Sequence, residues 1–158
     1  MSERIERPRG THDVIPADMP LWQRLTGEAE RLCALYGYRP IQTPVFEDTA
    51  LFARTSGEGS DVVQKEMYTF ADRSERSLTL RPEATASVLR AVLENRLDRG
   101  AGVKKFFTLG PMFRYERPQK GRFRQFFQIN CEAYGVEAPE LDVLVLPNLY
   151  GDIVSDLC

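Results

Sequence analysis

The chain has 158 residues, of which 42% are hydrophobic and 28% charged, a composition typical of a globular domain that buries a core. Its formal net charge of −2 excludes a generally basic nucleic-acid-binding protein but is compatible with a local basic patch. The single histidine, His12, excludes a histidine-based metal cluster or catalytic triad, and the three cysteines lack the spacing of a zinc site or a disulfide framework.

The first 17 residues are expected to form an irregular arm, because Pro8, Gly10 and Pro16 interrupt any helical periodicity. The arm has no apolar segment of the kind found in signal peptides. No apolar run in the sequence approaches membrane-spanning length. Together with cysteines that fit a reducing compartment, these features predict a cytoplasmic location without a membrane partner.

A helix is predicted after Asp18, which is placed to cap it, with Pro20 in its first turn and Gly37 at its end. Its apolar residues recur at helical spacing and predict one side that faces the core. They are Leu21, Trp22, Leu25, Ala29, Leu32, Cys33 and Tyr36.

Residues 38–47 are predicted to be extended. Pro40 and Pro44 prevent continuous pairing on both sides, so this segment is expected to be an edge or interface strand. Shorter elements are then predicted in this order: a helix over residues 51–57, a strand over 66–70 and a turn over 72–75.

Residues 78–85, LTLRPEAT, predict a strand that runs into the N-terminus of a helix over residues 84–97. Glu83 and Thr85 lie at this junction. Their simplest interpretation is a first-turn carboxylate favoured by the helix dipole and a capping hydroxyl. The buried stripe of the helix is expected to consist of Val88, Leu89, Val92 and Leu93.

Residues 106–135 predict a β-hairpin, because two aromatic-rich apolar runs flank a polar loop that contains Pro118 and Gly121. The loop over residues 114–124 has five cations and one anion, Glu116, which gives a local charge of about +4. The cations are Arg114, Arg117, Lys120, Arg122 and Arg124. Guanidinium groups match phosphate oxygens, so the loop is a candidate site for a polyanion.

The return strand of this hairpin alternates between two faces. One face is apolar and is expected to lie on a core, and the other presents Gln128, Asn130 and Glu132 in a row. This row could contact a small polar ligand while the loop binds a polyanion. The alternative is an ordinary amphipathic hairpin with a solvated polar face. Antiparallel strands with helices on one side predict an α+β fold.

The run GPMFRYERPQKGRFRQFFQINCEAYG, residues 110–135, resembles motif 2 of class II aminoacyl-tRNA synthetases in its histidyl-tRNA synthetase form. RGTHDVIP resembles the opening of that family, which packs near the active site, and the helix and strand over residues 18–47 resemble motif 1. KEMYTFADRSERSLTLRPEATA resembles a further segment of the family. The resemblance implies the class II catalytic core, an antiparallel sheet flanked by helices, in incomplete form.

The resemblance implies a ligase that uses ATP, with Mg²⁺, to activate histidine as histidyl adenylate and then transfers it to tRNA(His). Motif 1 implies a homodimer. By their places in motif 2, Arg114 would be the catalytic residue that clamps the α-phosphate, and Arg122 would reach the distal phosphates. Glu116 would lie near the adenine or a Mg²⁺ ion.

The same resemblance implies a histidine site. Glu83 and Thr85 would hold the α-ammonium group, because a carboxylate and a hydroxyl suit a cation. Gln128 and Glu132 would contact the imidazole.

The resemblance ends near residue 142, so we divide the chain into a partial catalytic domain, residues 1–142, and a foreign-looking tail, residues 143–158. In the tail, PNLYGDIVSDLC resembles the metal-binding segment of isocitrate and isopropylmalate dehydrogenases. Asp152 and Asp156 match its metal ligands, but without the remaining ligands they are not expected to form a working site.

Motif 3, the RGLDYY-like segment and the anticodon-binding domain of the family have no counterpart in the sequence, so we expect the chain alone to be inactive. Two alternatives stay open. One is a non-catalytic histidine-binding regulatory subunit of the ATP phosphoribosyltransferase type, although a regulator has no need of the phosphate-binding loop. The other is a fragment or chimera without a folded function.

Overall fold

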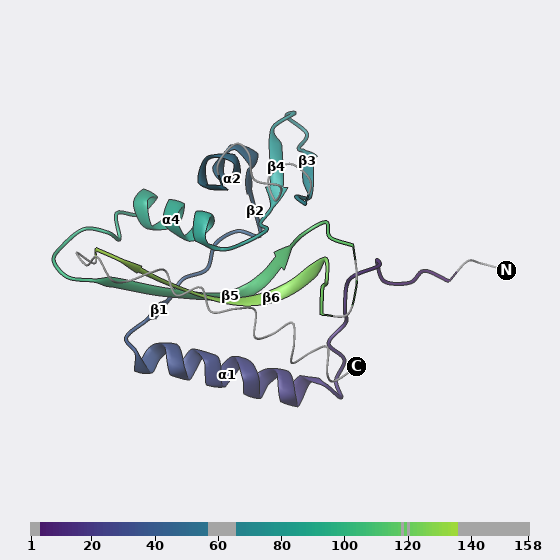
Figure 1. Cartoon of the computed structure of the whole chain (residues 1–158), viewed down its shortest axis with the longest axis horizontal. Helices are drawn as coiled ribbons and strands as arrows, with labels where there is room; N and C mark the ends of the chain where they lie inside the picture. The colour runs from purple at the N-terminus through teal and green to yellow at the C-terminus, as the bar shows by residue number, and fades with distance from the viewer. Residues whose placement is uncertain (1–3, 57–65, 118, 120, 136–158) are drawn as a thin grey trace.

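A computed structural model describes residues 4–56, 66–117, 119 and 121–135 (Figure 1). Its elements are, in chain order, α1 (Met19–Leu35), β1 (Arg39–Pro40), β2 (Phe46–Asp48), α2 (Thr49–Ser56), β3 (Thr69–Ala71), β4 (Ser77–Leu80), α4 (Thr85–Glu94), β5 (Lys104–Phe113) and β6 (Gln125–Tyr134). The predicted α+β fold is confirmed. The proposed tail, with Asp152 and Asp156, lies outside the described residues.

The predicted hairpin forms two of the three strands of one sheet, with the strand order β1-β5-β6. β5 and β6 pair antiparallel from Lys104↔Tyr134 to Phe113↔Gln125. β1 pairs with β5 in parallel over two residues only, and in the described part of the chain β1 and β6 are the two edges of this sheet. The expected edge strand is thus confirmed, although its parallel pairing makes the sheet mixed rather than purely antiparallel.

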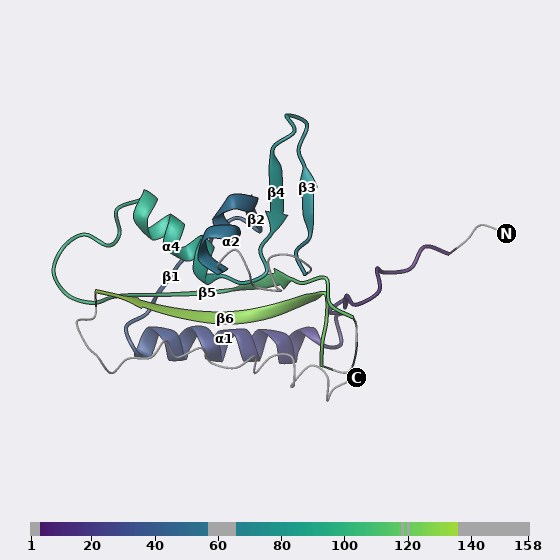
Figure 2. The same cartoon turned by 45° about the horizontal axis from the view of Figure 1, so that its top comes forward.

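A second, antiparallel sheet has the strand order β2-β4-β3. Figure 2 shows β3 and β4 projecting away from the long hairpin on the side where α2 and α4 lie. The predicted turn between β3 and β4 is confirmed: the Asp72 carboxylate accepts hydrogen bonds from the backbone N–H groups of Ser74 and Arg76, at 2.8 and 2.9 Å.

The helices cover both faces of the hairpin, so the expectation that they lie on one side is wrong (Figure 2). α1 packs on one face, where Trp22 meets Phe127 edge-on with ring centroids 4.6 Å apart. On the same face, the Sγ atoms of Cys33 and Cys131 are 3.7 Å apart. This face of β6 is the apolar one that the alternation predicted.

The prediction of a core-facing side on α1 is confirmed for part of its apolar stripe. Cys33 is buried, and Trp22, Leu25 and Ala29 are half-buried. Leu21, Leu32 and Tyr36, at 39%, 46% and 67% exposed, were also predicted to face the core and do not. Asp18 occupies the N-cap position but makes no side-chain capping bond. Gly37, with φ of 76°, ends the helix as predicted, because glycine adopts this left-handed conformation without steric cost.

The core lies on the opposite face of the hairpin, beneath α4, so the expectation that the apolar face of β6 lies on the core is wrong. It consists of Ala84, Val88, Val92, Phe106 and Met112, with Ile41, Phe126 and Tyr134 packed against it. Leu93 was predicted to be buried and is instead 56% exposed, whereas its neighbour Val92 is 1% exposed. Leu93 and the half-buried Leu89 are one position around the helix from the buried line of Val88 and Val92. No helix within the described ranges is long and apolar enough to span a membrane.

Candidate ligand-binding site on the polar face of the hairpin

The polar row of β6 faces the N-terminus of α4 rather than open solvent. Glu132 is 7% exposed, and its Oε1 accepts a hydrogen bond of 2.6 Å from Asn130 Nδ2. The same amide nitrogen lies 3.5 Å from Thr85 Oγ1. Gln128 Oε1 is buried without a hydrogen-bond partner among the described residues. The alternative of a solvated polar face is therefore wrong.

Glu83 caps α4. Its Oε2 accepts a hydrogen bond of 2.6 Å from the backbone N–H of Thr85, and its Oε1 accepts one of 3.0 Å from the N–H of Ala86. The simpler interpretation of Glu83 is thus confirmed, whereas the capping hydroxyl predicted for Thr85 is wrong, because that hydroxyl faces Asn130. A carboxylate has about four lone-pair positions, so two amide donors leave it free to accept further hydrogen bonds.

Arg114 connects the hairpin to the turn that holds Glu83. Its Nε donates a hydrogen bond of 3.0 Å to the carbonyl oxygen of Pro82. Its guanidinium carbon lies 5.1 Å from the centroid of the Phe126 ring, which is cation–π geometry. The planar group is held by its Nε and by its face, which leaves the outer nitrogens as candidate donors to an anion.

Glu116 lies between two of the loop cations. Its Oε1 is 3.9 Å from Arg114 Nη1 and its Oε2 is 3.6 Å from Arg122 Nη1. Arg124 Nε donates a hydrogen bond of 3.2 Å to the Glu116 carbonyl oxygen. Its guanidinium carbon lies 4.4 Å from the centroid of the Tyr115 ring. Part of the predicted positive charge is thus balanced within the loop, while the side chain of Arg122 stays 65% exposed.

The N-terminal arm is fixed to this loop. The carbonyl oxygen of Gly10 accepts hydrogen bonds from the backbone N–H groups of Arg124 and Gln125, at 2.7 and 3.3 Å. The rings of His12 and Phe123 meet edge-on with centroids 5.2 Å apart. Between the arm and the loop lies a cavity of about 500 Å³ that is open to solvent. It is lined by Glu6, Arg7, Pro8, Arg9, Gly10, Thr11, His12, Gln119, Arg122 and Phe123.

Two ionisable groups beside the polar row are held in their neutral forms. Burial raises the pKa of Tyr134, and the carboxylates of Glu132 and Glu83 add to this effect. Burial also raises the pKa of the Cys131 thiol to about 12, with a further contribution from Cys33. Tyr134 is on the face of the polar row and Cys131 is on the opposite face, toward Cys33 of α1. Neither group is a nucleophile near neutral pH.

Sequence reasoning placed Asn130 in the polar row without giving it a role, and it missed Arg81. Asn130 joins Glu132 to Thr85, which only the packing of β6 against α4 reveals. Arg81 is 1% exposed, an unusual state for a charged residue, and the sequence gives no sign of this burial. Among the described residues, no group of three or more acidic, histidine or cysteine side chains could hold a metal ion.

Comparison with known proteins gives one family. A family model described as histidyl-tRNA synthetase matches residues 10–151, which extends past residue 142. A histidine–tRNA ligase from Desulfitobacterium hafniense is 52% identical over 153 residues, which cover 97% of this chain and 36% of that protein. The corresponding ligase from Moorella thermoacetica is 56% identical over 141 residues, 89% of this chain and 33% of that protein.

Solved structures show the same likeness. Apo Staphylococcus aureus histidyl-tRNA synthetase superposes with a TM-score of 0.71 at 40% identity, over 86% of this chain and 30% of that one. A Bacillus halodurans protein described as an ATP phosphoribosyltransferase regulatory subunit/histidyl-tRNA synthetase gives a TM-score of 0.66 at 23% identity, over 83% and 32%. The second likeness concerns the fold alone. The chain spans about a third of the length of the curated relatives it matches.

Proposed function

The chain belongs to the histidyl-tRNA synthetase family, and from this premise we propose that it supplies the histidine- and ATP-binding residues of a histidine–tRNA ligase. In the proposed reaction, the carboxylate of histidine attacks the α-phosphorus of ATP and pyrophosphate leaves. A ribose hydroxyl of tRNA(His) then attacks the acyl carbon of histidyl adenylate, the acyl–phosphate bond breaks and AMP leaves. The first step needs little side-chain acid–base chemistry, because the positioning of the reactants and the stabilisation of charge lower its barrier.

The observation that carries the proposal is the hydrogen bond of 3.0 Å between Arg114 Nε and the carbonyl oxygen of Pro82. Pro82 directly precedes Glu83 in the chain. A guanidinium suited to a phosphate is therefore tied to the backbone beside a carboxylate suited to an ammonium group. Histidyl adenylate contains both of these groups, one on each side of the new acyl–phosphate bond.

In the proposed ATP site, Arg114 contacts the α-phosphate, where negative charge develops, and the exposed Arg122 reaches the distal phosphates. Glu116 lies near the adenine or a Mg²⁺ ion. Protein sites commonly bind Mg²⁺ through one or two carboxylates together with the phosphates of the substrate. The Glu116 carboxylate, next to both arginines, fits such a role, in which the ion would neutralise phosphate charge.

In the proposed histidine site, Glu83 and Thr85 hold the α-ammonium group and Gln128 and Glu132 contact the imidazole. Two features support this assignment. Gln128 Oε1 is a buried acceptor without a partner among the described residues. Glu132 is fixed by its 2.6 Å hydrogen bond from Asn130, which orients one oxygen and leaves acceptor positions for an imidazole N–H.

The proposal extends to tRNA(His) and a homodimer, as the family resemblance predicts, and to the cytoplasmic location that the cysteines and the absence of long apolar runs predict. Exposed apolar residues at the end of α1 support the homodimer, because they offer a surface that a second chain could cover. Leu32, Leu35 and Tyr36 are 46%, 69% and 67% exposed. The division at residue 142 and the metal ligands in the tail, Asp152 and Asp156, remain predictions.

Titration calorimetry with Mg²⁺·ATP tests the proposal and separates it from a histidine-binding regulator. We expect binding that Arg114→Ala weakens by about tenfold or more, the equivalent of one charged hydrogen bond. Arg31→Ala is the matched control, because Arg31 lies on the surface of α1 and, within the described residues, its ion-pair partner is Glu28 at 2.8 Å. A folded chain that binds histidine but not ATP would favour the regulator.

A further inference from the structure

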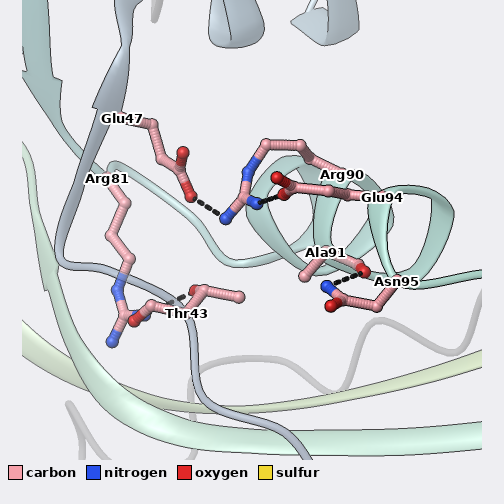
Figure 3. A network of polar contacts seen from close by, with 7 residues as sticks. All are labelled: Thr43, Glu47, Arg81, Arg90, Ala91, Glu94 and Asn95. Carbon is pink, nitrogen blue, oxygen red and sulfur yellow. Dashed lines mark hydrogen bonds and ion pairs between the residues drawn. The ribbon is translucent and has the colours of Figure 1, made fainter.

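Arg81 is a charged residue inside the protein. It follows β4, is 1% exposed, and lies two residues before Glu83. Within the described part of the chain its guanidinium makes three hydrogen bonds, all to the strands and loops around it. Nη1 donates to the carbonyl oxygen and to Oγ1 of Thr43, at 3.1 and 2.9 Å, and Nε donates to the carbonyl oxygen of Pro111 at 3.0 Å (Figure 3 shows the contact with Thr43).

The backbone of Arg81 continues this connection. Its N–H donates to the carbonyl oxygen of Val45 at 2.9 Å, and its own carbonyl oxygen accepts from the N–H of Phe113 at 2.9 Å. Arg81 thus joins three segments: the connection between β1 and β2, the turn that enters α4, and the end of β5. Arg114 directly follows Phe113, and Glu83 lies two residues after Arg81. Both charged residues of the proposed site are therefore next to backbone that Arg81 holds.

The guanidinium of Arg81 packs against Gly110 of β5, where a side chain would occupy its place. A Cβ atom placed on Gly110 would lie 2.4 Å from Arg81 Nη2, well inside contact distance. Gly110 is within β5 and its φ is not positive, so the glycine is required for space rather than for an unusual backbone conformation.

The burial of this charge is not explained by an ion pair. No carboxylate among the described residues lies within ion-pair distance of Arg81, and the nearby Glu47 is bonded to Arg90 at 2.6 Å (Figure 3). Burial lowers the pKa of Arg81, and Glu47 offsets this only in part. A buried charge costs several kcal/mol, so an apolar side chain would serve stability alone at least as well. What the guanidinium adds is a rigid, planar set of donors.

We propose that Arg81 is a positioning residue that fixes the separation between the carboxylate of Glu83 and the guanidinium of Arg114. The inference rests on the proposed function. Histidyl adenylate would contact both the Glu83 carboxylate and the Arg114 guanidinium, whereas histidine would contact only Glu83 and ATP only Arg114. A ligand that spans two subsites gains affinity from their fixed geometry, and it loses that gain when the separation varies.

The test measures the affinities of three ligands by calorimetry: histidine, Mg²⁺·ATP and a non-hydrolysable histidyl-adenylate analogue. The variants are Arg81→Lys, which keeps the charge but not the planar fork, and Gly110→Ala, which displaces the guanidinium without changing it. Arg76→Leu is the control, because Arg76 is 73% exposed on the β3–β4 turn. Circular dichroism checks that each variant is folded.

We expect both variants to lower the affinity for the analogue by about tenfold or more, while the affinities for histidine and for ATP each change by less than about threefold. Equal losses for all three ligands, or an unchanged analogue, would overturn the inference, since a merely structural residue has no reason to affect one ligand selectively. Unfolding of both variants would also overturn it, because Arg81 would then be required for folding. If the unaltered chain bound none of the ligands, the proposed function would be wrong and this inference would fall with it.

Discussion

Asn130 holds Glu132 in place: the side-chain amide nitrogen of the first lies 2.6 Å from a carboxylate oxygen of the second. The two residues are on the same face of β6, and the same nitrogen also approaches Thr85 at 3.5 Å. A buried carboxylate is thereby oriented by one neighbour and turned toward the N-terminus of α4. This arrangement converts a row of polar residues into a candidate site.

Replacing Asn130 with alanine is expected to weaken histidine binding by about fivefold to tenfold, because Glu132 loses the hydrogen bond that orients it. Calorimetric titration with histidine measures the effect. Asn95→Ala is the matched control, because the Asn95 amide donates to Ala91 O at 2.9 Å at the far end of α4. Equal histidine affinities for the two variants would contradict the role given to Asn130.

Two substitutions at Glu83 separate its capping role from its proposed ligand role. Glu83→Ala removes the acceptor for two amide groups, so it is expected to lower the free energy of unfolding by about 1 kcal/mol. Glu83→Gln keeps one carbonyl acceptor and should retain most of the stability, but it is expected to weaken histidine binding by about tenfold, because the negative charge is lost. Denaturant unfolding and calorimetry give the two quantities. If Glu83→Gln bound histidine with unchanged affinity, Glu83 would have a capping role and no role in ligand binding.

The limit of the core under α4 is tested by a pair of truncations on the same helix. Val88 is fully buried, so Val88→Ala is expected to lower the free energy of unfolding by about 2 kcal/mol through lost burial and the cavity that remains. Leu93 is 56% exposed, and Leu93→Ala is expected to change it by less than about 0.5 kcal/mol. Urea unfolding compares the two. Similar losses would mean that the core extends to the end of the helix.

The pKa of Cys131 predicts how stability changes in alkali. Burial raises this pKa from 9.0 to about 12, so the folded chain binds the thiol proton more tightly than the unfolded chain does. Its contribution to stability is therefore complete below pH 9 and is lost as the pH rises from 9 toward 12. The difference in unfolding free energy between the unaltered chain and Cys131→Ala, followed against pH, isolates this thiol from Tyr134. A difference that stays constant over this range would show that the thiol is not protected.

The hairpin and its two faces could be predicted from sequence because they depend on local patterns. The alternation along β6 has a period of two, and loop residues separate two apolar runs, so the strands and the residues on each face could be assigned. The face of Phe127 and Cys131 was expected to lie on a core, but it meets α1, and the core lies on the other face. The end of α1 at Gly37 is equally local, since it follows from one residue in a left-handed conformation.

The features that sequence reasoning missed depend on contacts between distant segments. Leu93 follows the apolar pattern of the helix, but only the line of Val88 and Val92 is covered by the core. The parallel pairing of β1 with β5 joins residues far apart in the chain. Glu83 shows the same limit at the site: its position at the start of a helix predicted a carboxylate favoured by the helix dipole, whereas its relation to Arg114 appears only through Pro82.

The most direct test of the account is calorimetric titration of the unaltered chain with a non-hydrolysable histidyl-adenylate analogue, repeated on Arg114→Ala and on the control Arg31→Ala. The account predicts binding that Arg114→Ala weakens by about tenfold or more and that the control leaves unchanged. A folded, monodisperse chain that does not bind the analogue, or binds it equally well without Arg114, would contradict the claim that these residues form its site.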